Sequence, residues 1–161
     1  MNLQTAEQAL EIRDLGLRDI AAFAILRHRI AEQNQFSLRA VAELPANGES
    51  FAEQIASTLK DPARKRILAL RDGRLIGFVS ASREGNALHL EIGIDAASIG
   101  QGVGWQLMQA AEAWARAAGV DRLELEVAPE NLRAIALYER CGFTVDRSAG
   151  GDTHPMSKIL D

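Results

Sequence analysis

Two hydrophobic periods alternate along this chain, one typical of strands and one typical of helices. Alternation at residues 10–13 predicts a short first strand. Apolar residues at steps of three and four over residues 20–30 predict a helix, with Asp19 as its N-cap. A second helical stripe predicts a helix over Ser50–Lys60, and the turn formers in segment 34–49 predict a loop before it.

The middle of the chain predicts an antiparallel meander. Two apolar runs, Arg66–Arg71 and Arg74–Ser82, are separated by Asp72-Gly73, a dipeptide that supplies the positive φ angles of a tight turn. Gly85-Asn86 is a second turn, and it leads into another apolar run at Ala87–Ile94. We therefore expect these segments to be consecutive neighbours in one sheet.

The C-terminal half predicts two further helices and three further strands. They are a helix over Trp105–Ala118 ended by Gly119, a strand at Arg122–Val127, a helix over Asn131–Cys141 ended by Gly142, and strands at Phe143–Arg147 and Met156–Leu160. The element order β-α-α-β-β-β-α-β-α-β-β predicts an α+β (mixed α/β) fold, a mostly antiparallel seven-stranded sheet flanked by about four helices. No repeat or linker interrupts it, so we expect one domain over residues 1–161.

Composition narrows the function. A net charge of −4 and a pI near 5.4 argue against a nucleic-acid partner. No apolar run approaches the roughly 18 residues of a membrane span. The N-terminus lacks the basic and apolar regions of a signal peptide, and the single cysteine, Cys141, excludes an intrachain disulfide. We therefore expect a cytoplasmic protein without membrane contact.

Three glycines, Gly100, Gly102 and Gly104, separate the strand at 87–94 from the helix that follows. Free N–H groups at a helix N-terminus attract an anion, and glycines let a ligand approach the backbone closely. The pattern therefore predicts a phosphate-binding loop. The alternative is a flexible loop that binds nothing.

A second hypothesis is that these glycines belong to a binding site for a nicotinamide cofactor. The dinucleotide fingerprint would need a glycine where Trp105 stands, although Glu124 lies near the position of its ribose-binding acid. The loop also follows an antiparallel meander, and only one β-α-β unit is present. A Walker loop is excluded, because no Gly-Lys-Ser/Thr follows.

Asn131, Ala134 and Tyr138 share one face of the helix predicted over 131–141. Asn131 is also a suitable N-cap, and Tyr138 could equally be a core residue. Ala134, between them, leaves room for a narrow ligand.

On two motifs the chain closely resembles the GNAT superfamily of acyl-CoA-dependent N-acetyltransferases. One is the Arg/Gln-x-x-Gly-x-Gly/Ala loop at 99–104, and the other is Asn-x-x-Ala-x-x-Leu-Tyr-x-x-x-Gly-Phe at 131–143. Leu75-Ile-Gly-Phe is also typical of the family, and the resemblance covers about residues 10–160. Ile99 departs from the family's Arg or Gln, and Trp105 stands where a polar residue is commoner.

The resemblance implies acetyl-CoA as co-substrate and assigns residues to it. The implied cofactor-binding residues are Ile92, Ile94, Gly100, Gln101, Gly102, Val103, Gly104, Asn131, Ala134 and Tyr138. Tyr138 is implied as the acid that protonates the departing thiolate. Ile92 and Ile94 are implied because the family's cofactor arm runs beside this strand like an extra strand.

A base must accept the proton of the attacking amine, because an amine with a pKa of about 10.4 is almost fully protonated at pH 7. The family often places a carboxylate on this strand, so Glu91 is the first candidate. His89, Glu124, Glu126 and a water molecule remain alternatives. No His, Cys or carboxylate group has metal-ligand spacing, so we predict no metal.

The leading hypothesis is an N-acetyltransferase that moves acetyl from acetyl-CoA to a primary amine of a small molecule or peptide, by direct attack in a ternary complex. The alternative is a degenerate acyl-CoA-binding sensor. We expect acceptor specificity to reside in residues 26–50 and 147–155, and the acidic composition mildly favours a cationic amine. Trp105 and an exposed edge strand at Met156–Leu160 favour a homodimer.

Overall fold

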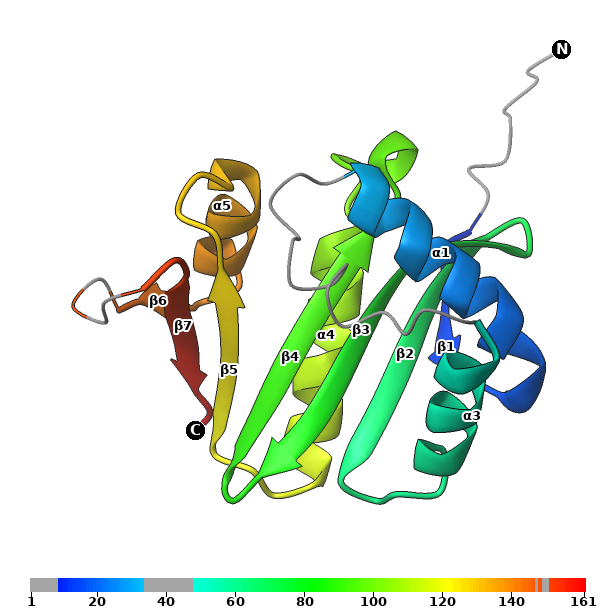
Figure 1. The fold of residues 1–161 in the computed structure, drawn as a ribbon. Coiled ribbons are helices and arrows are strands. Elements are labelled where there is room, and N and C mark those ends of the chain that lie inside the picture. The colour runs from blue at the N-terminus through cyan, green and yellow to red at the C-terminus, as the bar shows by residue number, and fades with distance from the viewer. Residues whose placement is uncertain (1–8, 34–47, 147, 149–150) are drawn as a thin grey trace, which may run out of the picture.

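The computed structural model describes residues 9–33, 48–146, 148 and 151–161. Its strands are β1 (Glu11–Asp14), β2 (Arg64–Arg71), β3 (Arg74–Glu84), β4 (Ala87–Ile94), β5 (Arg122–Val127), β6 (Thr144–Val145) and β7 (His154–Ile159). Its helices are α1 (Ile20–Gln33), α3 (Gly48–Thr58), α4 (Val103–Ala117) and α5 (Leu132–Arg140), with short 3₁₀ turns η1 (Leu17–Asp19) and η2 (Ala96–Ser98). The seven strands form one sheet in the order β1-β2-β3-β4-β5-β7-β6 (Figure 1).

The predicted α+β class, the seven strands and the central meander are confirmed. Strands β1 to β4 pair antiparallel in sequence order, and the β2–β3 turn places Asp72 and Gly73 at φ of 54° and 72°. Asn131 caps α5 as predicted, since its side chain accepts a hydrogen bond from the Ala134 N–H at 3.3 Å. Local periodicity and turn chemistry therefore located these elements correctly.

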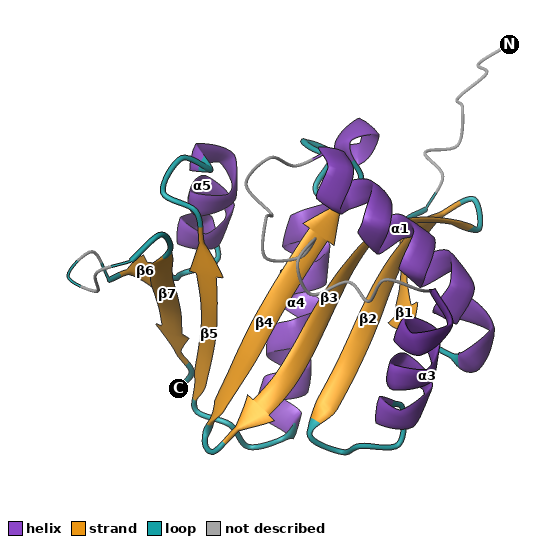
Figure 2. Ribbon diagram, in the orientation of Figure 1, coloured by secondary structure: helices purple, strands orange, loops and turns teal. Residues whose placement is uncertain are grey.

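Helices cover both faces of the sheet (Figure 2). On one face, α1 and α3 bury an apolar cluster that includes Phe23, Ile55 and Phe78. On the other face, α4 and α5 pack on a larger cluster that includes Leu107 and Tyr138. Alternate residues of each central strand therefore face different helices and different chemistry.

The pairing of β4 with β5 is parallel and short. It covers three positions, from Ala87 opposite Arg122 to His89 opposite Glu124. Beyond them the two strands diverge, while β4 stays paired with β3 as far as Ile94 (Figure 1). Within the described residues, the β5-facing edge of β4 therefore has no strand partner over residues 90–94.

Three details differ from the sequence prediction. The last strand, β7, is not an edge strand, because it lies between β5 and β6; sequence order cannot reveal this return of the chain. Helix α4 begins at Val103 instead of Trp105, because Gly102 already serves as its N-cap. Helix α3 begins at Gly48, inside the predicted loop, whose remainder at 34–47 lies outside the described residues.

Asp19 is not a simple N-cap of α1, because it ends the 3₁₀ turn η1. Its carboxylate accepts two hydrogen bonds from Arg13, at 2.7 and 2.9 Å, and one from the Gly16 N–H at 2.8 Å. The bonds from Arg13, helped by that from Gly16, lower the pKa of Asp19 from 3.8 to about 2. The pair ties β1 to the start of α1.

Asp19→Asn should therefore weaken the fold in a pH-dependent way. A carboxyl with a depressed pKa stabilises the fold above its unfolded pKa, and this contribution is lost as pH falls through the folded value. We expect a loss of about 1–2 kcal/mol in the free energy of unfolding at pH 7, shrinking to nothing between about pH 4 and pH 2. Urea unfolding across this range measures it, with the exposed Asp14→Asn as control. A pH-independent loss would contradict the assignment.

Candidate functional site

The predicted phosphate loop lies between η2 and α4. Gly100 and Gly102 have φ of 85° and 82°, the left-handed region that favours glycine. Apart from its chain neighbours, a Cβ built at either residue would meet no atom of the described residues within 4 Å, so the space beside the backbone is open. A ligand could therefore reach the backbone of this loop directly.

Amide donors gather at the same place. The N–H groups of Val103, Gly104 and Trp105 belong to the first turn of α4, where an α-helix has no internal acceptor for them. The first hydrogen bond of the helix is from Gln106 N–H to Gly102 C=O at 3.2 Å. These donors and the dipole of a 15-residue helix are features that favour an anion at this position.

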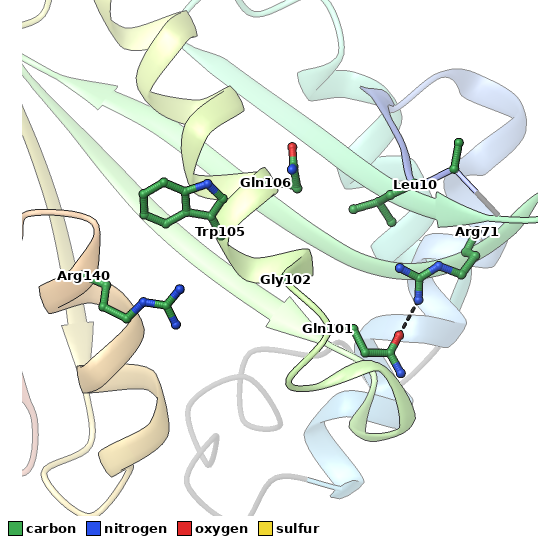
Figure 3. Close-up of a pocket in the computed structure, with 8 residues that line it drawn as sticks. Leu10, Arg71, Gln101, Gly102, Trp105, Gln106 and Arg140 are labelled. Atoms are coloured by element: carbon green, nitrogen blue, oxygen red, sulfur yellow. Dashed lines mark hydrogen bonds between the residues drawn. The ribbon is translucent and has the colours of Figure 1, made fainter. Parts of the chain in front are cut away.

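The loop is braced without a charged residue at Ile99, whose side chain is 38% exposed. Gln101 takes over this role: it accepts a hydrogen bond from Arg71 at the end of β2 and donates one to the Ala97 C=O at 3.3 Å (Figure 3). No motif in the sequence linked Arg71 to the loop, because the two lie 30 residues apart.

Asp95 anchors the other side of the loop to α1. Its side chain is buried and accepts hydrogen bonds from Arg29 at 2.9 Å and from Gln33 at 3.2 Å. Burial alone would raise the pKa of Asp95, but these bonds hold the pKa below its usual value. The segment that precedes the glycines is thereby held on the sheet.

A hollow of about 940 Å³ opens beside the loop. Figure 3 shows Arg71 from β2 and Arg140 from α5 on opposite sides of Gly102, with Trp105 between α4 and Arg140. The hollow therefore adds two cations and an aromatic ring to the backbone donors. Arg140 could have been noticed in the sequence, since it follows Tyr138 by two residues within the second motif.

Two predicted cofactor residues, Val103 and Gly104, face the core. Val103 is 1% exposed, and a side chain at Gly104 would lie 2.6 Å from Leu137 and 3.0 Å from Ile94. Gly104 thus permits close packing of α4 against α5 and β4, and these residues can offer a ligand only backbone groups. Ile92 and Ile94 pack against the same core, on the part of β4 that has diverged from β5.

Tyr138 is 7% exposed, with its ring 6.1 Å from that of Phe143. Burial raises the pKa of its phenol, so the hydroxyl stays protonated at neutral pH. This hydroxyl has no hydrogen-bond partner in the part of the chain that the structure describes. Tyr138 is therefore a core residue whose protonated hydroxyl could donate to a ligand.

Glu91 and His89 line a second hollow, of about 260 Å³, on the α1/α3 face of the sheet. Glu91 forms an ion pair with Arg27 of α1, at 3.0 Å. Glu124 and Glu126 alternate with buried residues on β5, and Glu124 lies opposite His89 and pairs with Arg122 at 2.7 Å. The four candidate bases thus lie on the two diverging strands.

Cys141 is buried, and burial raises the pKa of its thiol, which suits a packing role. Within residues 9–33, 48–146, 148 and 151–161, no three His, Cys, Asp or Glu side chains gather as a metal site would need. No helix in that part of the chain is long and apolar enough to cross a bilayer.

Comparison with known proteins assigns this fold and loop to a family. The description "Acetyltransferase (GNAT) family" matches residues 28–143, so the chain belongs to this family. The crystal structure of PaiA N-acetyltransferase from Thermoplasma acidophilum in complex with coenzyme A has the same fold, with a TM-score of 0.79 and 18% identity over 94% of this chain and 99% of that one.

Two curated relatives differ in how much of them the chain covers. The aminoalkylphosphonate N-acetyltransferase of Salmonella typhimurium is 29% identical over 135 residues, 78% of this chain and 88% of that protein. The mycothiol acetyltransferase of Beutenbergia cavernae is 51% identical over 53 residues, 33% of this chain and 18% of that protein. The chain spans 18% to 36% of three mycothiol acetyltransferases that it matches.

Gly102→Val should abolish most of the affinity for acetyl-CoA, because the new side chain would fill the open space beside the amide donors. The φ of 82° also strains a β-branched residue, so the matched control is Gly119→Val, at φ 75° at the other end of α4. Calorimetry should show a loss of binding for the first variant only. Equal affinities in the two variants would contradict this placement of the anion site.

Proposed function

We propose that the protein is an acetyl-CoA-dependent N-acetyltransferase that acts on a primary amine. The observation that carries this is the juxtaposition of the open amide donors at Gly102–Trp105 with the diverging edge of β4. The loop fits a pyrophosphate, and the unpaired edge fits an extended amide-containing arm that adds to the sheet like a strand. Membership of the GNAT family supports the same reading.

The residues present fit this co-substrate. Arg71 and Arg140 place positive charge beside the loop, where phosphate groups would lie. When bound, acetyl-CoA supplies an activated acetyl thioester. Tyr138 then donates its phenol proton to the departing thiolate, and a backbone N–H of β4 meets the charge that grows on the carbonyl oxygen.

Glu91 accepts the proton of the attacking amine, directly or through a water molecule. In the transfer, an N–C bond forms and a C–S bond breaks, so the amine loses one proton and the thiolate gains one. Glu91 faces α1 and Tyr138 lies in the α4/α5 core, on opposite faces of the sheet. This arrangement supports entry of the acceptor from the face opposite to the cofactor.

The names of the relatives support a small-molecule acceptor. An aminoalkylphosphonate is a small amine, and this relative is covered over most of its length. A peptide amine fits the same mechanism. The segments 34–47, 147 and 149–150, where we expect part of the specificity, lie outside the described residues.

A second candidate function is an acyl-CoA sensor without turnover. The ion pair between Glu91 and Arg27 favours it, because the carboxylate of the first candidate base already has a partner. Thiol release from acetyl-CoA in the presence of amines separates the two functions. A cytoplasmic location and a homodimer stay proposals; the homodimer now relies on Trp105 alone, which is 37% exposed.

Tyr138→Phe should lower kcat by about 10²–10⁴-fold, the usual worth of a general acid, and leave the affinity for acetyl-CoA nearly unchanged. The ring is kept and the lost hydroxyl has no partner in the described part of the chain, so the melting temperature should also be unchanged. Steady-state kinetics and calorimetry measure the two quantities. An unaltered kcat would show that Tyr138 serves only the core.

Glu91→Gln tests the base, because it removes the proton acceptor and keeps the shape. The rate should fall most at low pH, where the amine is mostly protonated, and recover as pH approaches the pKa of the amine. Glu124→Gln and Glu126→Gln are the matched controls on β5 and should have smaller effects. A pH-independent loss would indicate a structural role through the Arg27 pair and transfer the base assignment to another candidate.

A further inference from the structure

The second hollow, on the α1/α3 face, is lined by arginine and serine side chains that have no role in the catalytic assignment, which uses only Glu91 from this lining. Two rows of side chains cross its floor from β2 through β3 to β4. One row is Arg66, Ser80 and Glu91, and the other is Arg64, Ser82 and His89. Directly paired residues of adjacent strands share a face, so each row lies on one side of the sheet.

Positive charge is concentrated at the β2 end of these rows. Arg64 and Arg66 come from β2, and Arg27 reaches the hollow from α1. Lys65 does not add to them, because its ammonium lies over the Trp114 ring and pairs with Asp14 on the opposite face. Besides Lys65, the described lining of the hollow therefore has three guanidinium groups and one carboxylate, that of Glu91. Arg27 pairs with Glu91 at 3.0 Å and Arg64 with Asp61 at 3.6 Å.

Arg66 is crowded by like charge. Its Nη1 donates to Thr58 Oγ1 at 2.6 Å, and within the described residues it has no carboxylate partner at ion-pair distance. Burial, followed by repulsion from Arg27 and Arg64, lowers the pKa of Arg66. A bound anion would relieve this repulsion.

Ser80 supplies an independent observation at the centre of the first row. Its Oγ is shielded from solvent and has no hydrogen-bond partner among the described residues. A buried hydroxyl without a partner costs free energy unless a ligand satisfies it. Ser80 lies directly between Arg66 and Glu91, where a ligand that bridges them would pass.

Carboxylates lie at the other end of the rows, and two of them have an arginine partner: Glu91 pairs with Arg27 and Glu124 with Arg122. Beyond β4, where the acetyl group would arrive, β5 carries Glu124 in register with His89, and Glu126 two residues later. The cations of β2 and the carboxylates of β4 and β5 are therefore separated by β3, which contributes only the serines. This order of arginines on β2, serines on β3 and carboxylates on β4 and β5 matches a molecule with an anion at one end and an amine at the other.

We propose that the amine acceptor carries an oxyanion, a carboxylate, phosphonate or phosphate, a few atoms from its amine. Arg66 and Arg64 hold the oxyanion, Ser80 donates its hydroxyl to it, and the amine lies at Glu91 beside the diverging strands. This deepens the proposed function and rests on it. The local charge opposes a purely cationic amine, which the overall acidic composition had favoured.

The test compares four amines that differ in the second group: 2-aminoethylphosphonate, β-alanine, propylamine and 1,3-diaminopropane. With acetyl-CoA and the full chain, thiol release should give a kcat/KM at least about 10-fold higher for an oxyanion-bearing amine than for propylamine, since hydrogen bonds to charged groups are the strong ones. The diamine should be the poorest acceptor. The two oxyanion amines separate a phosphonate from a carboxylate site.

Arg66→Gln should raise KM for the preferred oxyanion amine by about 10- to 100-fold and change kcat/KM for propylamine much less. The matched control is Arg18→Gln, which removes the same charge from an exposed position on η1. If Arg66→Gln fails to fold, Ser80→Ala replaces it. This variant deletes an unpartnered hydroxyl, so it should keep the melting temperature and still raise KM.

Calorimetry of the same amines on the CoA-bound protein distinguishes this inference from the proposed function. Binding of an oxyanion amine that weakens in Arg66→Gln, without thiol release, would support the acceptor site and reject the transferase. Thiol release with equal kcat/KM for all four amines would support the transferase and overturn the inference. An unchanged KM in both Arg66→Gln and Ser80→Ala would overturn it as well.

Discussion

The divergence of β4 from β5 after three paired positions is the constraint on which the rest of the structure depends. A strand edge without a partner leaves backbone donors and acceptors that need water or a ligand. Continuous pairing with β3 holds β4 straight beside the opening. Gly104, packed against Leu137 and Ile94, lets α4 and α5 meet across it from one face. The strand pairing of the sheet is therefore interrupted between β4 and β5, and this gap in the pairing lies beside the start of α4.

The two faces of this gap carry different charge and different chemistry. On the α4/α5 face, apolar side chains, the buried phenol of Tyr138 and the amide donors of the loop suit a long phosphorylated thioester. On the α1/α3 face, guanidinium groups, serines and carboxylates are arranged in rows. Because successive residues of β4 point to opposite faces, Ile92 packs on the α4/α5 core while Glu91 lines the hollow on the α1/α3 face.

The loop shows how a missing side chain is replaced by tertiary contacts. The family's Arg or Gln is absent at Ile99, yet Gln101 is bonded to Arg71 and Asp95 is bonded to Arg29. These contacts attach the loop to the β2–β3 hairpin on one side and to α1 on the other. Since α1 also contributes Arg27 to the acceptor face, one helix contacts both halves of the candidate site.

The sequence by itself determined the elements whose causes are local. Helical periods, the Asp72-Gly73 turn, the Asn131 cap and the glycines before α4 all act within a few residues, so the α+β class and the position of the glycine loop could be predicted. Only the tertiary structure decided that β7 returns between β5 and β6, and that Arg66, Ser80 and Glu91 form one row. The reason is physical: strand order and register depend on contacts between distant segments, and neither period nor turn chemistry encodes which distant residues will face each other.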